Sequence, residues 1–359
     1  MSAEATLKAW LALSLTRGLG GESARRLLRE FGSPDAVFSA PINSLKSAVK
    51  MDVATEIGRG IADEVVDPAL VWLEDNNNHV VTLADDDYPK ALLNIPDPPL
   101  LLYVKGRLDL LNRSALAVVG SRSATPQGIH NAEAFAKSLS DAGLCIISGL
   151  AHGIDAAAHR GALRGQGGSI AIVGTGLDKV YPAANRDLAH SLAQHGTLIS
   201  EFPLGTPPLA ANFPRRNRLI SGMSLGCLVV EASLQSGSLI TARLALEQGR
   251  EVFAIPGSIH APQSKGCHAL LKQGAKLVET AQDILEELGG VTGTFALPSS
   301  GPDDANPLVL EHFGFDPVDV DTLSSRCGLT IAELSAMLLT LELSGHICAL
   351  PGGLYQRIH

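Results

Sequence analysis

The sequence predicts an α/β protein in which a doubly wound parallel sheet lies between a small helical domain and a second small domain at the carboxyl end. Three observations predict it. Helical periodicity fills the first 70 or so residues, short apolar runs alternate with longer stretches between about 115 and 280, and the last 50 or so residues combine helices with a terminal hairpin.

The composition bounds the class of protein. The 359 residues are 45% hydrophobic and 18% charged, which is enough for more than one folded domain. With 28 Lys and Arg against 37 Asp and Glu, the formal net charge is -9, so any nucleic-acid site has to be a local patch. The five widely spaced cysteines favour buried, reduced thiols. The amino terminus is unlike a secretory signal and no apolar run approaches the ~20 residues of a membrane span, which predicts a cytoplasmic protein without membrane association.

The first domain is assigned to residues 1–79. Apolar residues return every three or four positions there, and the stretch GLGGESARRLLREFGSP is similar to a helix-hairpin-helix or SAM-like module. Residues 80–111 are rich in Pro and Asp, which predicts an irregular segment before the main sheet begins.

The central domain is assigned to residues 80–288. Its predicted strands are the apolar runs ALAVVG, LCIISG, SIAIVG, TLISEF, CLVVEA, EVFAIPG and AKLVET. Most are separated by stretches long enough for a helix, and buried strands that alternate with helices form a parallel, Rossmann-like sheet.

The end of the chain is predicted to be a linker followed by a winged-helix-like domain. Residues 289–306 are dense in Gly, Ser, Pro and Asp, which is typical of a linker. Residues 307–359 read as three helices and two strands around a Pro-Gly-Gly turn, and the third helix begins with the capping-box spacing of Thr330 and Glu333.

Several predicted strands end in small residues. Before a helix, such loops offer free backbone amides and the positive end of the helix dipole, which suit phosphate. A doubly wound fold also needs small residues at these turns, so one loop alone would be weak support. Several loops at one sheet edge favour a phosphate site. The candidate residues in these loops are Gly120, Ser121, Arg122, Ser148, Gly149, Gly174, Gly237 and Ser238.

A second candidate segment is Asn212 to Ile220. Pro214 is typical of a helix start, and Arg215, Arg216 and Arg218 follow it, where cations oppose the helix dipole. An external anion explains this placement better than a solvated face does. Phe213 could stack on a base, although an aromatic residue beside proline is often simply packed. Replacing Arg122 or Arg216 by alanine is expected to weaken binding without unfolding the protein.

Three enzyme signatures do not fit their context. Gly222 to Gly226 has the nucleophile-elbow spelling but precedes a strand. His152, Asp155 and His159 lack a further nearby ligand, so a metal site is the weaker interpretation. The Gly-Lys-Ser/Thr spelling of a P-loop is absent.

Long motifs in a fixed order resemble one family. They are VVGSRSATPQG, ISGLAHGIDAAAHRGAL, GTGLDKVYP, NFPRRNRLISG, VVEASLQSGSLITARLALEQGR and VFAIPGS. From about Gly106 to Leu288 the chain is similar to the DNA processing protein A family, also called DprA or Smf.

The resemblance implies a non-enzymatic protein that binds single-stranded DNA, protects it as it enters the cell, forms a homodimer and loads a RecA-type recombinase during natural transformation, with no cofactor or metal. It implies DNA contacts at Gly120 to Arg122, at Ser148 and Gly149, and from Phe213 through Arg215, Arg216 and Asn217 to Arg218. Some members have a lysine where Ala183 stands here, and Lys179 or Arg186 could take its place.

The alternative is a nucleotide-processing enzyme of the related phosphoribohydrolases, which carry a Gly-Gly-x-Gly-Thr-x-x-Glu loop. In the comparable stretch from Ser236 to Leu244, Ile240 replaces a glycine and Leu244 stands where the acid would be. A dehydrogenase is weaker still, because Gly-x-Gly-x-x-Gly is not intact after the first predicted strand.

The tail carries its own expectation. Residues 307–359 hold two Arg and no Lys against six Asp and Glu, and the third helix has no cation. Helices that read a DNA groove need cations for phosphate. We therefore expect this domain to contact protein, or its own chain, rather than duplex DNA.

Overall fold

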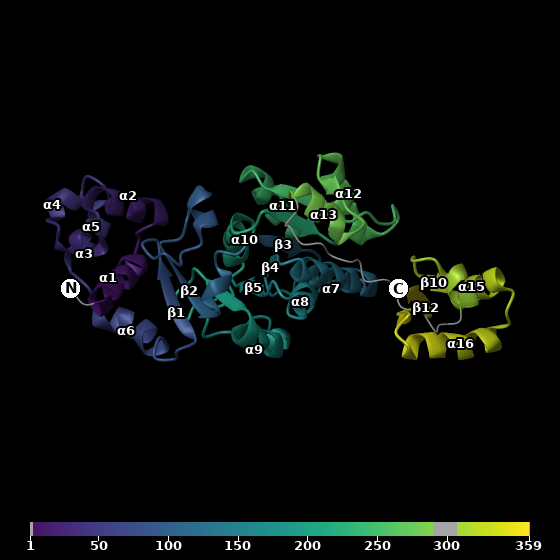
Figure 1. The fold of residues 1–359 in the computed structure, drawn as a ribbon. Helices are drawn as coiled ribbons and strands as arrows, with labels where there is room; N and C mark the ends of the chain where they lie inside the picture. Colours follow the sequence, from purple (N-terminus) through teal and green to yellow (C-terminus); the bar gives the residue numbers. More distant parts are fainter. Residues whose placement is uncertain (1–2, 290–306, 359) are drawn as a thin grey trace.

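The protein begins with a helical domain, at the left of Figure 1. The computed structural model describes residues 3–289 and 307–358. The first helices are α1 (Ala3–Leu15), α2 (Gly21–Phe31), α3 (Pro34–Ser39), α4 (Ile42–Leu45), α5 (Met51–Gly58) and α6 (Asp63–Trp72). Ser33 caps α3 by accepting a hydrogen bond from the amide of Ala36, and Pro34 occupies its first turn. Leu13, Leu27 and Ile57 meet in the core of this domain.

The central domain is a nine-stranded sheet in the order β1-β2-β6-β5-β4-β3-β7-β8-β9. Its parallel part confirms all seven strands expected from the sequence: β3 (Ala115–Val119), β4 (Cys145–Ser148), β5 (Ser169–Ile172), β6 (Thr197–Ser200), β7 (Gly226–Val229), β8 (Glu251–Ala254) and β9 (Lys276–Leu277). The chain winds outward from β3 to β6 and then returns beside β3 with β7, so the strand order reverses between β3 and β7.

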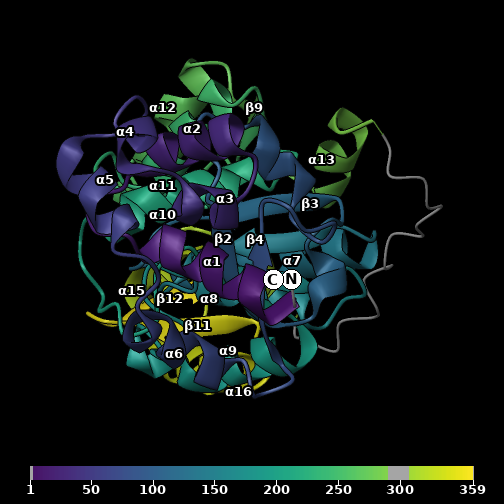
Figure 2. The same ribbon diagram turned by 90° about the vertical axis from the view of Figure 1, so that its left-hand side faces the viewer.

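The expectation of an irregular segment over residues 80–111 is wrong. Strands β1 (Asn78–Thr82) and β2 (Leu101–Gly106) add to the sheet, with β2 antiparallel to both β1 and β6. These strands lie among Pro- and Asp-rich turns and two short 3-10 helices, Lys90–Asn94 and Leu108–Leu110. Because of these turns, the apolar runs of the two strands were not recognised in the sequence. Figure 2 looks at the sheet from the side of the N-terminal helices, where Trp10 and Leu11 of α1 pack against Leu101 and Tyr103 of β2.

Helices cover both faces of the parallel strands. They are α7 (Pro126–Asp141), α8 (Ile154–Ala162), α9 (Arg186–His195), α10 (Asn212–Gly222), α11 (Ser238–Glu247), α12 (Lys265–Lys272) and α13 (Ala281–Glu287), with short 3-10 turns at Ala183–Asn185 and Pro262–Ser264. The side chains of successive residues in β3 point to opposite faces of the sheet. Leu116 packs with residues of α7 and α8, and Ala117 packs with residues of α10 and α11. Both side chains are fully buried, as expected of a strand covered on both sides.

The carboxyl-terminal domain has the expected winged-helix elements (Figure 1, right). Helices α14 (Pro307–Phe313), α15 (Val320–Cys327) and α16 (Ile331–Leu343) pack with strands β11 (Ile347–Leu350) and β12 (Leu354–Arg357). The expected capping box of Thr330 and Glu333 is present at the start of α16. A short strand, β10 (Val318–Asp319), was missed and pairs with β12. Of the expected linker, residues 290–306 lie outside the described part of the chain.

Candidate nucleic-acid interface

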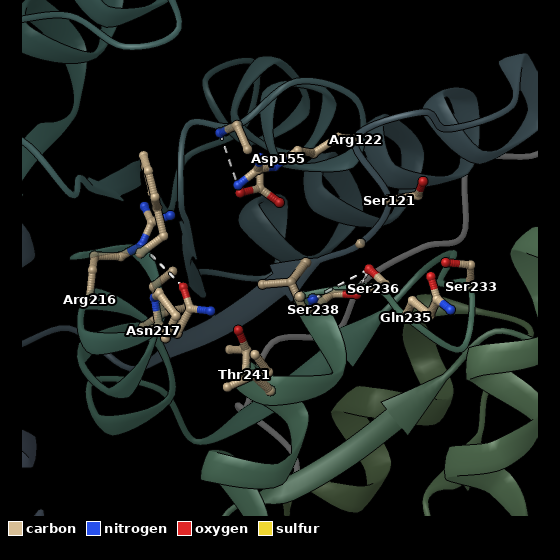
Figure 3. A pocket seen from close by; sticks show the side chains of 18 of the residues that line it. Ser121, Arg122, Asp155, Arg216, Asn217, Ser233, Gln235, Ser236, Ser238 and Thr241 are labelled. Carbon is tan, nitrogen blue, oxygen red and sulfur yellow. Dashed lines mark hydrogen bonds between the residues drawn. The ribbon is translucent and has the colours of Figure 1, made fainter. Parts of the chain in front are cut away.

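A cavity of about 670 Å³ opens where the strand order of the sheet reverses. Its walls come from the loop after β3 (Gly120, Ser121, Arg122), the segment after β7 that leads into α11, and the start of α10. Figure 3 shows Arg216 and Asn217 on one side and Ser233, Gln235, Ser236 and Ser238 on the other. Ligands of open α/β sheets bind at such a reversal of strand order. Two of the predicted loops, those after β3 and β7, therefore meet at this edge of the sheet.

The loop after β3 is fixed by close backbone packing. A Cβ on Gly120 would lie 2.6 Å from Ile154 Cγ1 and 2.8 Å from the Glu231 carbonyl oxygen, so a side chain there would force the loop to move. The Ser121 amide donates to that same carbonyl at 2.8 Å, and the Ser123 amide donates to Ser121 Oγ. These contacts hold the neighbouring Arg122 in the cavity wall.

Arg122 and Phe213 face each other in this wall. The Arg122 guanidinium carbon lies 5.6 Å from the centroid of the Phe213 ring. The centroid of the Tyr181 ring lies 5.7 Å from the same Phe213 centroid. Gly174 lies under the ring, because a Cβ there would lie 3.1 Å from Phe213 Cδ1. Arg122 makes no ion pair within residues 3–289 and 307–358, which leaves its charge available to a ligand.

Arg216 forms hydrogen bonds with two backbone segments behind the cavity wall. Its side chain is buried, and its Nη1 donates to the carbonyl oxygens of Gly149, at 2.7 Å, and of Ile172. Burial lowers the pKa of Arg216 to about 10, against the opposing effect of Asp155. Burial likewise raises the pKa of Asp155, although Arg216 and the amides of Ala151 and Gly149 counter it. Arg216 therefore joins the ends of β4 and β5, so we expect its replacement to destabilise the fold in addition to any effect on binding.

The other two arginines of α10 also have partners inside the chain. Arg218 pairs with the buried Glu201 and, at 3.7 Å, with Asp97, while Arg215 contacts Glu201 at 3.2 Å. Burial raises the pKa of Glu201, and Arg218 opposes that effect. The cations at this helix start are therefore balanced internally, which corrects the argument that an external anion was needed to explain them. Arg215 remains more than half exposed.

The remaining candidates are divided by position. Gly237 and Ser238 line the cavity, whereas Ser148 is fully buried and donates to the Val118 carbonyl at 2.6 Å. The Gly149 carbonyl accepts a hydrogen bond from Arg216, and Gly174 packs against the Phe213 ring. Outside the cavity lining, Lys179 Nζ donates to the Gly205 carbonyl and Arg186 is exposed at the start of α9.

Sequence reasoning missed part of the polar wall. Ser233, Gln235, Thr241 and Gln263 line the cavity, and three of them flank the Gly237-Ser238 turn that the sequence indicated. The position of that turn after a buried strand could have pointed to them. Gln263 comes from a 3-10 turn far along the chain, and no local pattern indicates it.

The weaker alternatives now have structural explanations. Ser224, in the nucleophile-elbow spelling, is buried in a turn and donates to the Ile220 carbonyl. His159 is buried with its Nδ1 2.8 Å from Ser169 Oγ. Within the described residues there is no cluster of three His, Cys, Asp or Glu side chains that could hold a metal ion, and no helix is long and apolar enough to cross a bilayer.

The fold and the cavity define a Rossmann-like α/β protein with a cavity, lined in part by polar side chains, at the reversal of its strand order. Two family models match the chain. The model described as DNA recombination-mediator protein A covers residues 79–289, and the DprA winged helix domain covers residues 294–353. The chain belongs to the DNA recombination-mediator protein A family, whose curated members are named DprA or Smf.

Relatives support this assignment along most of the chain. Protein Smf of Escherichia coli K12 is 47% identical over 305 residues, which covers 82% of this chain and 81% of that protein. The structure of DNA processing protein A from Streptococcus pneumoniae superposes with a TM-score of 0.69 and 39% identity, over 78% of this chain and 97% of that one. A structure described as showing the single-stranded DNA binding mode of the Helicobacter pylori protein gives 0.54 and 32%, over 58% and 95%.

Proposed function

We propose that the protein binds single-stranded DNA in the cavity between β3 and β7. The observation that carries the proposal is the pairing of Arg122 with Phe213 in the cavity wall. A guanidinium can grip a phosphate through two parallel hydrogen bonds, and its contact with the Phe213 ring holds it in the cavity wall. The Gly237 turn and the hydroxyls of Ser121 and Ser238 add further polar groups for phosphate oxygens. The related Helicobacter pylori protein is described as binding single-stranded DNA.

The test compares single- and double-stranded oligonucleotides of equal length by fluorescence anisotropy. Phosphates of a flexible strand can turn into a cavity while its bases splay outward, whereas a duplex holds both rigidly. The expected result is tighter binding of the single strand. Equal or tighter binding of the duplex would contradict the proposal.

We propose further that the protein has no catalytic reaction, and that it protects incoming DNA in the cytoplasm and loads a RecA-type recombinase during natural transformation as a homodimer. Support comes from membership of the DNA recombination-mediator protein A family. Light scattering of the purified chain should give twice the mass of 37.5 kDa. The recombinase should assemble faster on DNA coated by this protein than on DNA coated by a general single-strand binder, and an unchanged rate would rule out loading.

The enzyme alternative has a direct assay. Leu244 of α11 stands where the phosphoribohydrolases carry their acid. We expect no release of base from a nucleoside monophosphate incubated with the purified chain. Turnover that disappears in a folded Arg122→Ala variant would instead assign an enzyme to this cavity.

A further inference from the structure

Helix α16 of the winged-helix domain is apolar on two opposite faces. Leu334, Leu338 and Leu341 lie in the domain core. On the other side, Leu339 is 58% exposed and Leu343 is 81% exposed. Their spacing of four residues places these two side chains, called here the outer face of α16, one above the other on the helix.

The polar side chains on this side do not make the outer face hydrophilic. Ser335 lies one turn before Leu339, and its Oγ donates to the Ile331 carbonyl at 2.7 Å. Thr340 Oγ1 donates to the Ala336 carbonyl at 3.1 Å. Hydroxyls that bond the helix's own carbonyls have given up their donors, so an apolar partner can cover them at little cost.

The charges near the outer face determine which partner fits. Helix α16 carries Glu333 and Glu342 and no Lys or Arg, so the face lacks the cations that a phosphate backbone needs. A second copy of the same face would bring these acids close to their own counterparts, which costs free energy. A partner with cations beside its apolar residues would pair with them.

We propose that the outer face of α16 docks an amphipathic helix of a partner protein, one whose apolar stripe is flanked by Lys or Arg. Such helix-on-helix recognition uses anchors spaced by three, four and seven residues, and Leu339 and Leu343 have the four-residue spacing. The proposal does not depend on DNA binding, since none of these residues lines the cavity between β3 and β7.

The test uses the full-length chain and two labelled synthetic helical peptides. Both carry leucines at one helical stripe, flanked by Lys in one peptide and by Glu in the other. The Lys peptide should bind the wild type, and a Leu339→Ser/Leu343→Ser variant should bind it about tenfold or more weaker, because two apolar anchors are lost. The matched control is Val65→Ser/Val71→Ser on α6, which removes two side chains that are 50% and 63% exposed elsewhere and should change nothing.

A charge variant keeps the test informative if the double variant misfolds. The Glu342→Lys variant should bind the Lys peptide more weakly than the wild type does, and should bind the Glu peptide more tightly. Three results would overturn the proposal: equal binding of the Lys peptide by wild type and a folded serine variant, equal binding of both peptides by the wild type, or a dimer of the wild type that the serine variant dissociates, which would assign the outer face to a second copy.

Discussion

Arg216 is the residue whose role the structure changes most. Its guanidinium donates to the carbonyl oxygens at the ends of β4 and β5, and it opposes the charge of the buried Asp155. Replacing it with alanine would leave a buried carboxylate without its counter-charge, so Arg216→Ala should lower the free energy of unfolding by roughly 3–5 kcal/mol.

Urea denaturation measures this loss. Arg215→Ala is the matched control on the same helix, because Arg215 is 58% exposed and its ion pair should contribute about 1 kcal/mol or less. Equal stabilities of the two variants would show that Arg216 does not brace the strand ends.

His159 should make stability depend on pH. Burial lowers the pKa of His159 to about 3. Ser169 Oγ donates to the Ile146 carbonyl, so it accepts from Nδ1–H of a neutral imidazole. In the unfolded chain the pKa is about 6.5, so below that pH the unfolded state binds the extra proton, and stability falls progressively as pH drops toward 3.

The expected loss from this group between pH 7.5 and pH 5 is about 2 kcal/mol. Urea midpoints of the wild type and of His159→Asn, whose amide can still donate to Ser169, measure it at both pH values. The wild type should lose about 2 kcal/mol more than the variant. Parallel losses in the two proteins would mean that His159 titrates normally in the folded state.

At the scale of elements, α7 and α8 cross at Gly161. A Cβ there would lie 2.2 Å from the Glu133 carbonyl oxygen of α7. Gly161→Ala should therefore separate the two helices and destabilise the protein by about 1–3 kcal/mol, although alanine is the better helix former. Thermal unfolding against Gly237→Ala, where a Cβ meets nothing within 4 Å, gives the comparison. A gain in stability at Gly161 would contradict the close crossing.

The elements that the sequence predicts well have strong local signals. The seven parallel strands and the capping box of α16 follow from apolar runs and from one residue pair. Strands β1 and β2 were missed because they lie among Pro- and Asp-rich turns. The direction of each arginine on α10 could not be predicted either, since Gly149, Glu201 and Asp97 approach only in the folded chain.

At the scale of the whole molecule, contacts link the N-terminal helices to the helix that bears Phe213. Arg25 of α2 pairs with Asp97 at 2.7 Å, and Asp97 lies 3.7 Å from Arg218 of α10. The protein has a formal net charge of -9, so its overall charge repels the negatively charged DNA. The cations of the cavity therefore have to supply the attraction locally.

The most direct test is the salt dependence of single-strand binding in Arg122→Ala. The matched control is Arg164→Ala, which removes an exposed arginine that pairs with Glu133 and does not line the cavity. Loss of one phosphate contact should weaken binding about tenfold. It should also make the negative slope of log affinity against log salt less steep by about 0.7, while the control variant matches the wild type. A folded Arg122→Ala protein with unchanged affinity and unchanged slope would contradict DNA binding at this cavity.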